Sequence, residues 1–263
     1  MKIKRIKLQK PKNTREFGGY PTADGRTIRH NMLIRSGQLS KATDADLKKL
    51  TEEYNLRTVI DLRIDAEIEE KPDKLLPGIN YIRVPLLDKA YLGITRDEYS
   101  LQSWFNLFTD ESRRPEDIFF DMYEMLVFGE RSKKLIPEIF SIFSENNEAV
   151  LWHCSAGKDR VGIVSMLILL ALGVDKEVIV YDFLATNRFS AGEIIKTRVF
   201  APFVIRNRWQ RKCLAILMGV KREYMDRLLS RINNDYSDIF DFFEKVYSID
   251  KATILKLREK YLQ

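Results

Sequence analysis

Short apolar runs bounded by turn residues punctuate the first half of the chain and predict β-strands. Residues 32–35 form one such run, and residues 58–62 form another that is rich in β-branched side chains. A third run covers residues 81–87, and a fourth, at residues 149–153, lies further along the chain. Because the runs at residues 58–62 and 81–87 have the length and composition of buried strands, we expect both to enter one sheet.

Helical spacing of apolar residues dominates the rest of the chain. We expect a first helix at about residues 44–54, where Thr43 suits the N-cap and the carboxylates of Asp44 and Asp46 suit the positive N-terminal end. The later predicted helices share an apolar stripe with a period of 3.6 residues. They cover residues 116–128, 132–143, a stretch that starts near Arg160, and residues 176–185, 218–232, 237–246 and 251–261.

This distribution of strands and helices indicates an α/β fold, with a central, mostly parallel sheet flanked by helices on both faces. With 263 residues, of which 45% are hydrophobic, the chain is long enough to bury one full core. No internal repeat and no low-complexity segment divides the sequence. We therefore expect one domain over residues 1–263.

The charge and the residue composition limit which classes of partner and which kinds of metal site we expect. The net charge of +6 and the pI near 9.1 favour anionic partners, such as phosphorylated proteins, phosphoinositide headgroups, a membrane surface or nucleic acid. Only two cysteines and two histidines are present, without Cys-x-x-Cys spacing, so we expect no zinc site.

The sequence contains neither a long apolar span nor the pattern of a signal peptide. The longest uncharged apolar run, residues 161–174, is short for a bilayer span, and the basic start lacks the apolar stretch of a signal peptide. We therefore expect a cytoplasmic protein.

The sequence HCSAGKDRVG, from His153 to Gly162, follows a predicted strand and opens a predicted helix. This order suits a phosphate cradle, because backbone N–H groups at a helix N-terminus can converge on one anion. The predicted phosphate-binding residues are the six that follow the cysteine: Ser155, Ala156, Gly157, Lys158, Asp159 and Arg160.

Cys154 is the predicted nucleophile of this loop. The positive end of the helix, together with Lys158 and Arg160, favours the thiolate, which is the reactive form of cysteine. Arg160 can hold two phosphate oxygens with its planar guanidinium, and Gly157 permits the tight bend. The alternative is that Cys154 merely ends a buried strand beside a solvated cluster of charges. Chance, however, gives His-Cys-x-x-Gly-x-x-(Lys/Arg) in only on the order of 10⁻⁴ of such chains.

HCSAGKDR resembles the Cys-x5-Arg signature of protein tyrosine phosphatases and of their dual-specificity and lipid-phosphatase relatives. Its Gly-Lys-Asp-Arg core is similar to that of bacterial tyrosine and phosphoinositide phosphatases of the atypical dual-specificity type. NTREFGGY at residues 13–20 resembles that family's Asn-x-Arg-Asp-x-Gly-Gly opening, and VIDLR at residues 59–63 resembles its first central strand. The resemblance covers nearly the whole chain and implies a tyrosine-phosphatase-like fold that needs no metal or other cofactor.

Two positions depart from the family pattern. Glu16 stands where an aspartate is usual, and Val161 stands where a threonine or serine usually follows the signature arginine. In the family that hydroxyl stabilises the cysteine thiolate as it leaves in the hydrolysis step. Slow turnover is therefore an open alternative for this chain.

The resemblance implies a reaction in two steps: Cys154 displaces the leaving alcohol to form a phosphocysteine, and water then hydrolyses it. Two carboxyl groups are candidates for the acid that protonates the leaving oxygen, Asp159 in the loop and Asp88 at the end of a predicted strand. We favour Asp159, because its place in the loop keeps it near the phosphate. We expect His153 to support the thiolate through hydrogen bonds rather than to transfer protons. In this resemblance Lys158 suggests a phosphoinositide or a second anionic group near the pocket.

Aromatic and cationic residues interleave in TRVFAPFVIRNRWQRK, residues 197–212. Arginines that bind phosphates and aromatic rings that stack on bases would suit nucleic acid. No recognised binding motif accompanies them, so we do not expect a nucleic-acid partner. Because related enzymes have helical lids in this region, we expect a lid insertion at about residues 190–215 or a surface that contacts a membrane peripherally.

The leading hypothesis is a cysteine-dependent phosphatase that acts first of all on phosphotyrosine in proteins, with phosphoinositide and phosphoserine or phosphothreonine as further substrates. The alternative is a catalytically weak phosphate-binding module, a pseudophosphatase that recognises phosphorylated protein or lipid. A third class, an arsenate reductase, would need partner thiols, and Cys213, which we expect in the core, offers at most one. Asp61 and Arg63 are expected to tie strands and loops together.

Overall fold

The structure is a computed structural model, which describes residues 3–74, 76–87 and 112–263. In this part of the chain six strands form one sheet in the order β1-β2-β3-β6-β4-β5. The strands are β1 (Lys4–Arg5), β2 (Arg15–Glu16), β3 (Leu33–Ser36), β4 (Leu56–Asp61), β5 (Asn80–Arg83) and β6 (Ala149–His153). β3, β6, β4 and β5 are parallel to one another, whereas β1 and β2 pair antiparallel at one edge. The prediction of a mostly parallel sheet is confirmed.

Most of the described helices follow β5 in the chain. The helices are α1 (Asp44–Glu52), α2 (Asp65–Glu70), α4 (Pro115–Phe128), α5 (Glu130–Glu145), α6 (Asp159–Ala171), α7 (Lys176–Phe189), α8 (Ala191–Val204), α9 (Arg208–Leu217), α10 (Arg222–Asp235), α11 (Ile239–Tyr247) and α12 (Lys251–Tyr261). Over the described residues, no helix combines the length and the apolar character that crossing a bilayer requires.

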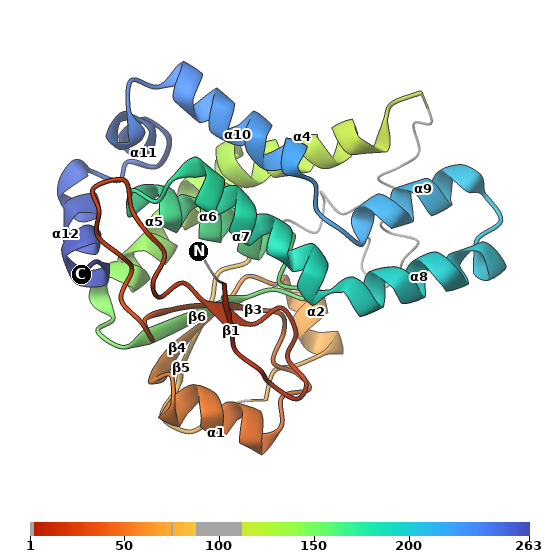
Figure 1. Cartoon of the computed structure of the whole chain (residues 1–263), viewed down its shortest axis with the longest axis horizontal. Coiled ribbons are helices and arrows are strands. Elements are labelled where there is room, and N and C mark those ends of the chain that lie inside the picture. The colour runs from red at the N-terminus through yellow and green to blue at the C-terminus, as the bar shows by residue number, and fades with distance from the viewer. Residues whose placement is uncertain (1–2, 75, 88–111) are drawn as a thin grey trace.

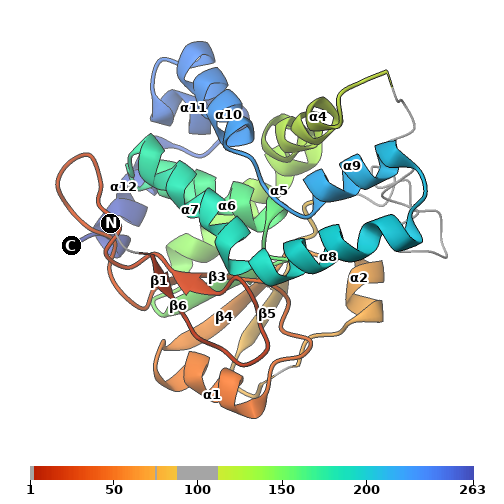
Figure 2. The ribbon, with the colours of Figure 1, turned by 45° about the vertical axis from the view of Figure 1, so that its right-hand side comes forward.

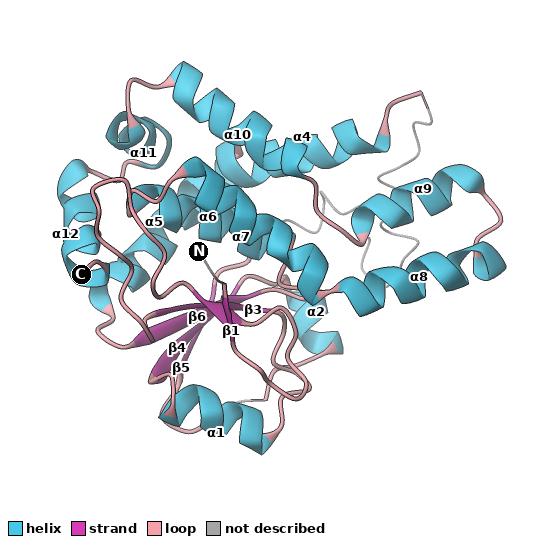
Figure 3. Ribbon diagram, viewed as in Figure 1, coloured by secondary structure: helices cyan, strands magenta, loops and turns pink. Residues whose placement is uncertain are grey.

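Helices cover both faces of the sheet, but unequally. α1 packs on one face, where Leu47 and Leu50 join Val59 and Leu151 of the strands in an apolar cluster. The other face carries the larger cluster, to which α4, α5, α6, α7 and the C-terminal helices contribute. Figures 1 and 2 both show α1 below the sheet and α6 and α7 above it, and Figure 3 shows the strands between these layers. The predicted α/β class is confirmed.

Local sequence explains where several elements begin and end. Thr43 caps α1 as predicted, because its side chain accepts a hydrogen bond from the N–H of Asp46 while the Asp46 carboxylate accepts one from the N–H of Thr43. β5 ends at Arg83, earlier than the predicted residue 87. Pro85 accounts for the difference, since it has no N–H with which to continue a strand.

The helix predicted at residues 218–232 is wrong at its start. Residues 218–221 form a connection between α9 and α10. In it the side chain of Asn187, from α7, accepts a hydrogen bond from the N–H of Val220 over 2.8 Å and donates one to its carbonyl over 2.8 Å. Because these bonds occupy both backbone groups of Val220, the residue does not need the bonds that a helix would supply.

The centre of the fold lies at β6 and α6. β6 pairs with β3 on one side and with β4 on the other, and all of its residues are buried. α6 follows after a short loop and is buried around almost its whole circumference. Residues 154–158 therefore connect a central strand with a central helix at the carboxyl edge of the parallel strands, which is the edge where α/β folds place their binding sites.

α8 and α9 extend beyond these layers, as Figures 1 and 2 show. α9 buries Cys213, Leu214 and Ile216, whereas α8 has no buried residue. Together the two helices occupy the segment that the sequence suggests as an insertion. That this segment acts as a lid remains a prediction.

Candidate active site

A tight loop, residues 154–158, joins β6 to α6. Gly157 in this loop has a φ of +67°, and a Cβ atom there would lie 2.6 Å from the backbone nitrogen of Gly37. Such a close approach of two backbones admits only glycine, as the sequence suggests. The loop therefore packs directly on the chain that follows β3.

Two buried side chains hold the loop from the interior of the protein. Asn13 Nδ2 donates to the carbonyl oxygen of Gly157 over 2.6 Å, and Arg35 Nη2 donates to the same oxygen over 2.9 Å. Asn13 is 1% exposed and Arg35 is 0% exposed. Because both donors are buried and reach one carbonyl, they fix the peptide plane at Gly157 and with it the shape of the loop.

Arg35 is in turn held by a buried group of charges. Asp182 of α7 accepts from Arg35 Nη1 over 2.7 Å and from Arg15 Nε over 2.7 Å. The hydroxyl of Tyr20 also donates to Asp182, over 2.8 Å. Burial alone would raise the pKa of Asp182, but the adjacent Arg15 and Arg35 lower it below its usual range. We call these four residues the Asp182 cluster; it ties β2, β3 and α7 together behind the loop.

Cys154 stands at the start of the loop and lines a cavity of about 220 Å³. It is only 3% exposed. Five of the six predicted phosphate-binding residues line the same cavity: Ser155, Ala156, Lys158, Asp159 and Arg160. The sixth, Gly157, holds the loop against the interior. The structure therefore brings the predicted nucleophile and its predicted phosphate-binding loop to one small space.

Glu67 of α2 fixes the guanidinium of Arg160. Nη1 and Nη2 of Arg160 donate to the two carboxylate oxygens over 2.5 and 2.7 Å, and Nη1 also donates to the Leu62 carbonyl over 3.2 Å. The hydroxyl of Ser155 donates to the same carboxylate. Burial would raise the pKa of Glu67, but Arg160 lowers it to about 2. Because a bidentate pair sets the plane of the guanidinium, Arg160 meets the cavity in a fixed orientation.

Lys158 and Asp159 contact the helices around the cavity. Lys158 donates from its ammonium group to the carbonyl of Leu217 at the end of α9. Asp159 accepts from the hydroxyl of Tyr123 of α4 over 2.5 Å. Burial, reinforced by Asp159, raises the pKa of Tyr123 well above its usual value, so the hydroxyl keeps its proton and holds the carboxylate beside the cavity. The other candidate acid, Asp88, lies outside the described residues.

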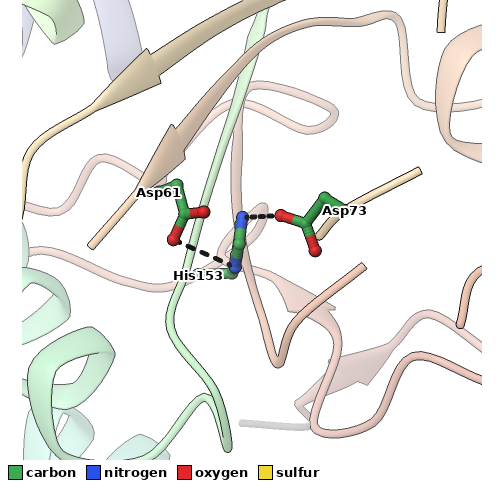
Figure 4. A group of neighbouring side chains, drawn as sticks. All are labelled: Asp61, Asp73 and His153. Atoms are coloured by element: carbon green, nitrogen blue, oxygen red, sulfur yellow. Dashed lines mark ion pairs between the residues drawn. The ribbon is translucent and has the colours of Figure 1, made fainter. Parts of the chain in front are cut away.

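His153 is fully buried and lies between two carboxylates, as Figure 4 shows. Its Nε2 is 2.9 Å from Asp73 Oδ2, and its Nδ1 is 3.9 Å from Asp61 Oδ1 and 3.4 Å from the carbonyl oxygen of Cys154. Burial would raise the pKa of Asp73, but its contact with His153 lowers it below the usual range. The ring thus contacts the backbone of Cys154, the predicted nucleophile, which fits a supporting role.

Asp61, Asp73 and His153 also come close enough to suggest a metal site, since one donor atom of each lies within 4.8 Å of the others. Arg63, however, lies against both carboxylates: Nη2 is 2.7 Å from Asp61 Oδ2 and 2.8 Å from Asp73 Oδ2. Its guanidinium supplies the positive charge that a metal ion would otherwise bring. We therefore assign this group to holding His153 and the ends of the strands, the role expected for Asp61 and Arg63.

Sequence reasoning missed several residues that support the loop. Glu67 and Asp73 belong to a charged stretch in which no pattern distinguishes them from neighbouring carboxylates. Asp182 did leave a signal, because it interrupts the apolar stripe of α7 beside Phe183, where a carboxylate needs a buried partner. Cys213 is fully buried, as expected for a core thiol.

Comparisons of the sequence with a family model and with known proteins agree on one group. The model of the tyrosine phosphatase family matches residues 6–263 of the chain. A candidate tyrosine-protein phosphatase of Cupriavidus necator is 25% identical over 259 residues, which cover 95% of this chain and 85% of that protein. The triple specificity protein phosphatase PtpB of Mycobacterium tuberculosis is 26% identical over 254 residues, 88% of this chain and 91% of that protein. The solved structure of P. aeruginosa TpbA in complex with pTyr matches 78% of this chain and 90% of that chain, with 12% identity and a TM-score of 0.28.

Proposed function

Since the chain belongs to the tyrosine phosphatase family, we propose that it hydrolyses phosphate monoesters through a phosphocysteine formed on Cys154. The observation that carries this proposal is the meeting of Cys154 and Arg160 in one small cavity. The guanidinium is oriented there by Glu67 before any substrate arrives. A preorganised cation beside a nucleophile stabilises charge that develops on phosphate oxygens without reorganisation during the reaction.

The proposed reaction has two displacements at phosphorus. In the first, the Cys154 thiolate attacks, the bond from phosphorus to the leaving oxygen breaks, and Asp159 gives its proton to that oxygen. In the second, water attacks the phosphocysteine, Asp159 takes a proton from the water, and the sulfur leaves as thiolate. The loop N–H groups and Arg160 stabilise the equatorial oxygens in both transition states.

We propose phosphotyrosine in proteins as the first substrate. Met122 and Leu217 give the cavity apolar walls against which an aromatic ring can pack above the loop. The names of the similar proteins, which include tyrosine and triple specificity phosphatases, support the same substrate class. Phosphoinositides and phosphoserine or phosphothreonine are the further substrates that we propose, because Lys158 adds a second cation at the cavity for another anionic group.

Hydrolysis of para-nitrophenyl phosphate, with a chelator present and at mildly acidic pH, tests the nucleophile. We expect activity in the wild type and none in Cys154→Ser, because the hydroxyl is a far weaker nucleophile than the thiolate. Cys213→Ala removes the other cysteine, which lies buried in α9, and should retain activity. Activity in Cys154→Ser equal to that of the wild type would contradict the cysteine mechanism.

The role of Asp159 is tested by varying the leaving group. Para-nitrophenolate leaves readily without a proton, whereas phenolate needs one, so Asp159→Asn should slow the hydrolysis of phenyl phosphate by about 10²-fold or more and that of para-nitrophenyl phosphate much less. Tyr123→Phe is the matched control, since it removes the hydroxyl bound to Asp159 but keeps the acid. An equal loss on both substrates in Asp159→Asn would remove it as the general acid.

Val161 favours a second candidate function, a phosphate-binding module with slow turnover. The residue next to Arg160 has no hydroxyl to stabilise the departing thiolate, and its side chain is fully buried. In rapid-mixing experiments this function predicts a burst of para-nitrophenol followed by slow release, with a phosphocysteine stable enough to trap. Val161→Thr would then accelerate the slow phase. Steady turnover without a burst would favour the phosphatase.

A further inference from the structure

α8 presents an apolar face that the described part of the protein leaves open. Five of the seven exposed large hydrophobic side chains among the described residues belong to this helix: Ile195, Val199, Phe200, Phe203 and Val204. We call these five residues the α8 apolar face. Phe203 is 83% exposed and Val204 is 80% exposed, so these side chains do not pack against the edge of the hydrophobic core.

The spacing of these residues places them on one side of the helix. Ile195, Val199 and Phe203 follow one another at intervals of four residues, and Phe200 and Val204 lie beside that line. The residues of α8 that are half-buried, such as Ile194, fall on the other side. The helix therefore packs against its neighbours by that other side. Figure 1 shows α8 extending away from the sheet, with α9 next to it.

Positive charge is concentrated in the segment that carries this face. Residues 191–217 contain six Lys or Arg and one Glu, a net charge of +5, against +6 for the whole chain. The single acid, Glu193, pairs with Lys12. Lys196, Arg206 and Arg208 are exposed close to the apolar residues in the chain. Almost the whole excess of positive charge of the protein is thus concentrated on the segment that exposes its apolar side chains.

An anionic lipid membrane fits this combination better than the other partners do. A helix with an apolar face and a cationic surround binds at the boundary between headgroups and acyl chains. Nucleic acid could bind the cations through its phosphates and stack its bases on the aromatic rings. The aliphatic side chains of Ile195, Val199 and Val204 offer it neither interaction. A second copy of the chain would bring another face with the same positive charge, and the two would repel each other.

We propose that the α8 apolar face docks on anionic lipid membranes. Phe200, Phe203 and Val204 enter the acyl boundary, and the cations of residues 191–217 contact the headgroups. Ser190, the N-cap of α8, and Glu193 in its first turn both line the catalytic cavity, so docking brings the cavity beside the membrane. The docking stands by itself, whereas its consequence, access to lipid phosphate monoesters in the membrane, rests on the proposed function.

Co-sedimentation of the full chain with vesicles tests the docking separately from the chemistry. Vesicles of phosphatidylcholine alone are compared with vesicles of phosphatidylcholine and phosphatidylserine, neither of which holds a phosphate monoester. We expect binding only when phosphatidylserine is present, and weaker binding as salt screens the charges. Each cation near an anionic surface contributes about a fivefold gain in affinity, so Arg206→Glu with Arg208→Glu should lower it about thirtyfold or more.

The apolar contribution is tested by Phe200→Ser with Phe203→Ser, for which we expect a loss of affinity on the order of tenfold or more. Leu255→Ser and Lys256→Glu are the matched controls, because both residues are exposed on α12, which Figures 1 and 2 show on the opposite side of the molecule. These controls should bind as the wild type does. Equal binding by the α8 variants and the controls would overturn the proposal.

Three other outcomes would also overturn it. The first is no phosphatidylserine-dependent binding by the wild type. The second is binding of a single-stranded oligonucleotide, but not of vesicles, that the α8 variants lose. The third is self-association in light scattering that the same variants abolish.

The α8 variants also separate the docking from the chemistry. Their rate of para-nitrophenyl phosphate hydrolysis should equal that of the wild type, so failure of the docking would leave the phosphatase proposal intact.

Discussion

The loop of residues 154–158, the predicted phosphate-binding loop, and α8 border the same cavity but are built in opposite ways. The loop rests on Asn13 and Arg35, both buried, and on the Asp182 cluster behind them. α8 has no buried residue and places its apolar side chains in solvent. A buried ion pair tolerates little change, because removing one partner leaves an uncompensated charge, whereas an exposed helix face tolerates much. The chain thus separates the part that shapes the cavity, where we propose the reaction, from the part that is exposed to the surroundings.

The largest expected effect comes from breaking the cluster. Asp182→Ala leaves Arg15 and Arg35 buried without their carboxylate, so we expect the free energy of unfolding to fall by about 3–5 kcal/mol. Urea denaturation measures it. Asp235→Ala is the control, since Asp235 pairs with Arg231 at the surface and should change stability by about 0.5 kcal/mol or less. Equal losses in the two variants would mean that the cluster does not stabilise the fold.

A somewhat smaller and pH-dependent effect is expected for Glu67→Gln. Because Arg160 lowers the pKa of Glu67 from 4.5 to about 2 in the folded protein, the charged pair contributes stability that is fully present above pH 4.5 and is lost as the pH falls through about 2. The shift corresponds to on the order of 3 kcal/mol. Urea denaturation of wild type and variant between about pH 6 and pH 3 should show their difference shrinking as the pH falls. A constant difference would contradict the pairing.

The smallest expected effect on stability is that of a substitution on α8, the exposed helix. Phe203→Ser on α8 should change the free energy of unfolding by about 0.5 kcal/mol or less, because the side chain is 83% exposed. The matched variant Phe183→Ala, at a position on α7 that is 1% exposed, should cost about 3–5 kcal/mol. If Phe203→Ser proved as costly as Phe183→Ala, α8 would be packed more firmly than its exposure indicates.

Elements governed by local signals were the predictable part of the fold. β6 has the predicted bounds of residues 149–153, and α12 has the predicted bounds of residues 251–261. Thr43 caps α1 through contacts three residues apart in the chain. Such signals act within a few residues, so they do not depend on how distant parts of the chain pack. The start of α10 was missed for the opposite reason, because Asn187, which fixes Val220, lies 33 residues away.

The sequence by itself determined the central strand, the glycine turn and the spacing of Cys154, the predicted nucleophile, from the arginine in the first turn of α6, because these features depend on neighbours within one strand, one turn and one helix. Only the tertiary structure decided what supports them. Glu67 and Arg160 are 93 residues apart in the chain, and Arg35 and Asp182 are 147 apart. From the sequence alone, many carboxylates of the chain could form the ion pair with a given arginine. Which one does so depends on the packing of the sheet and helices, and no local pattern encodes that choice.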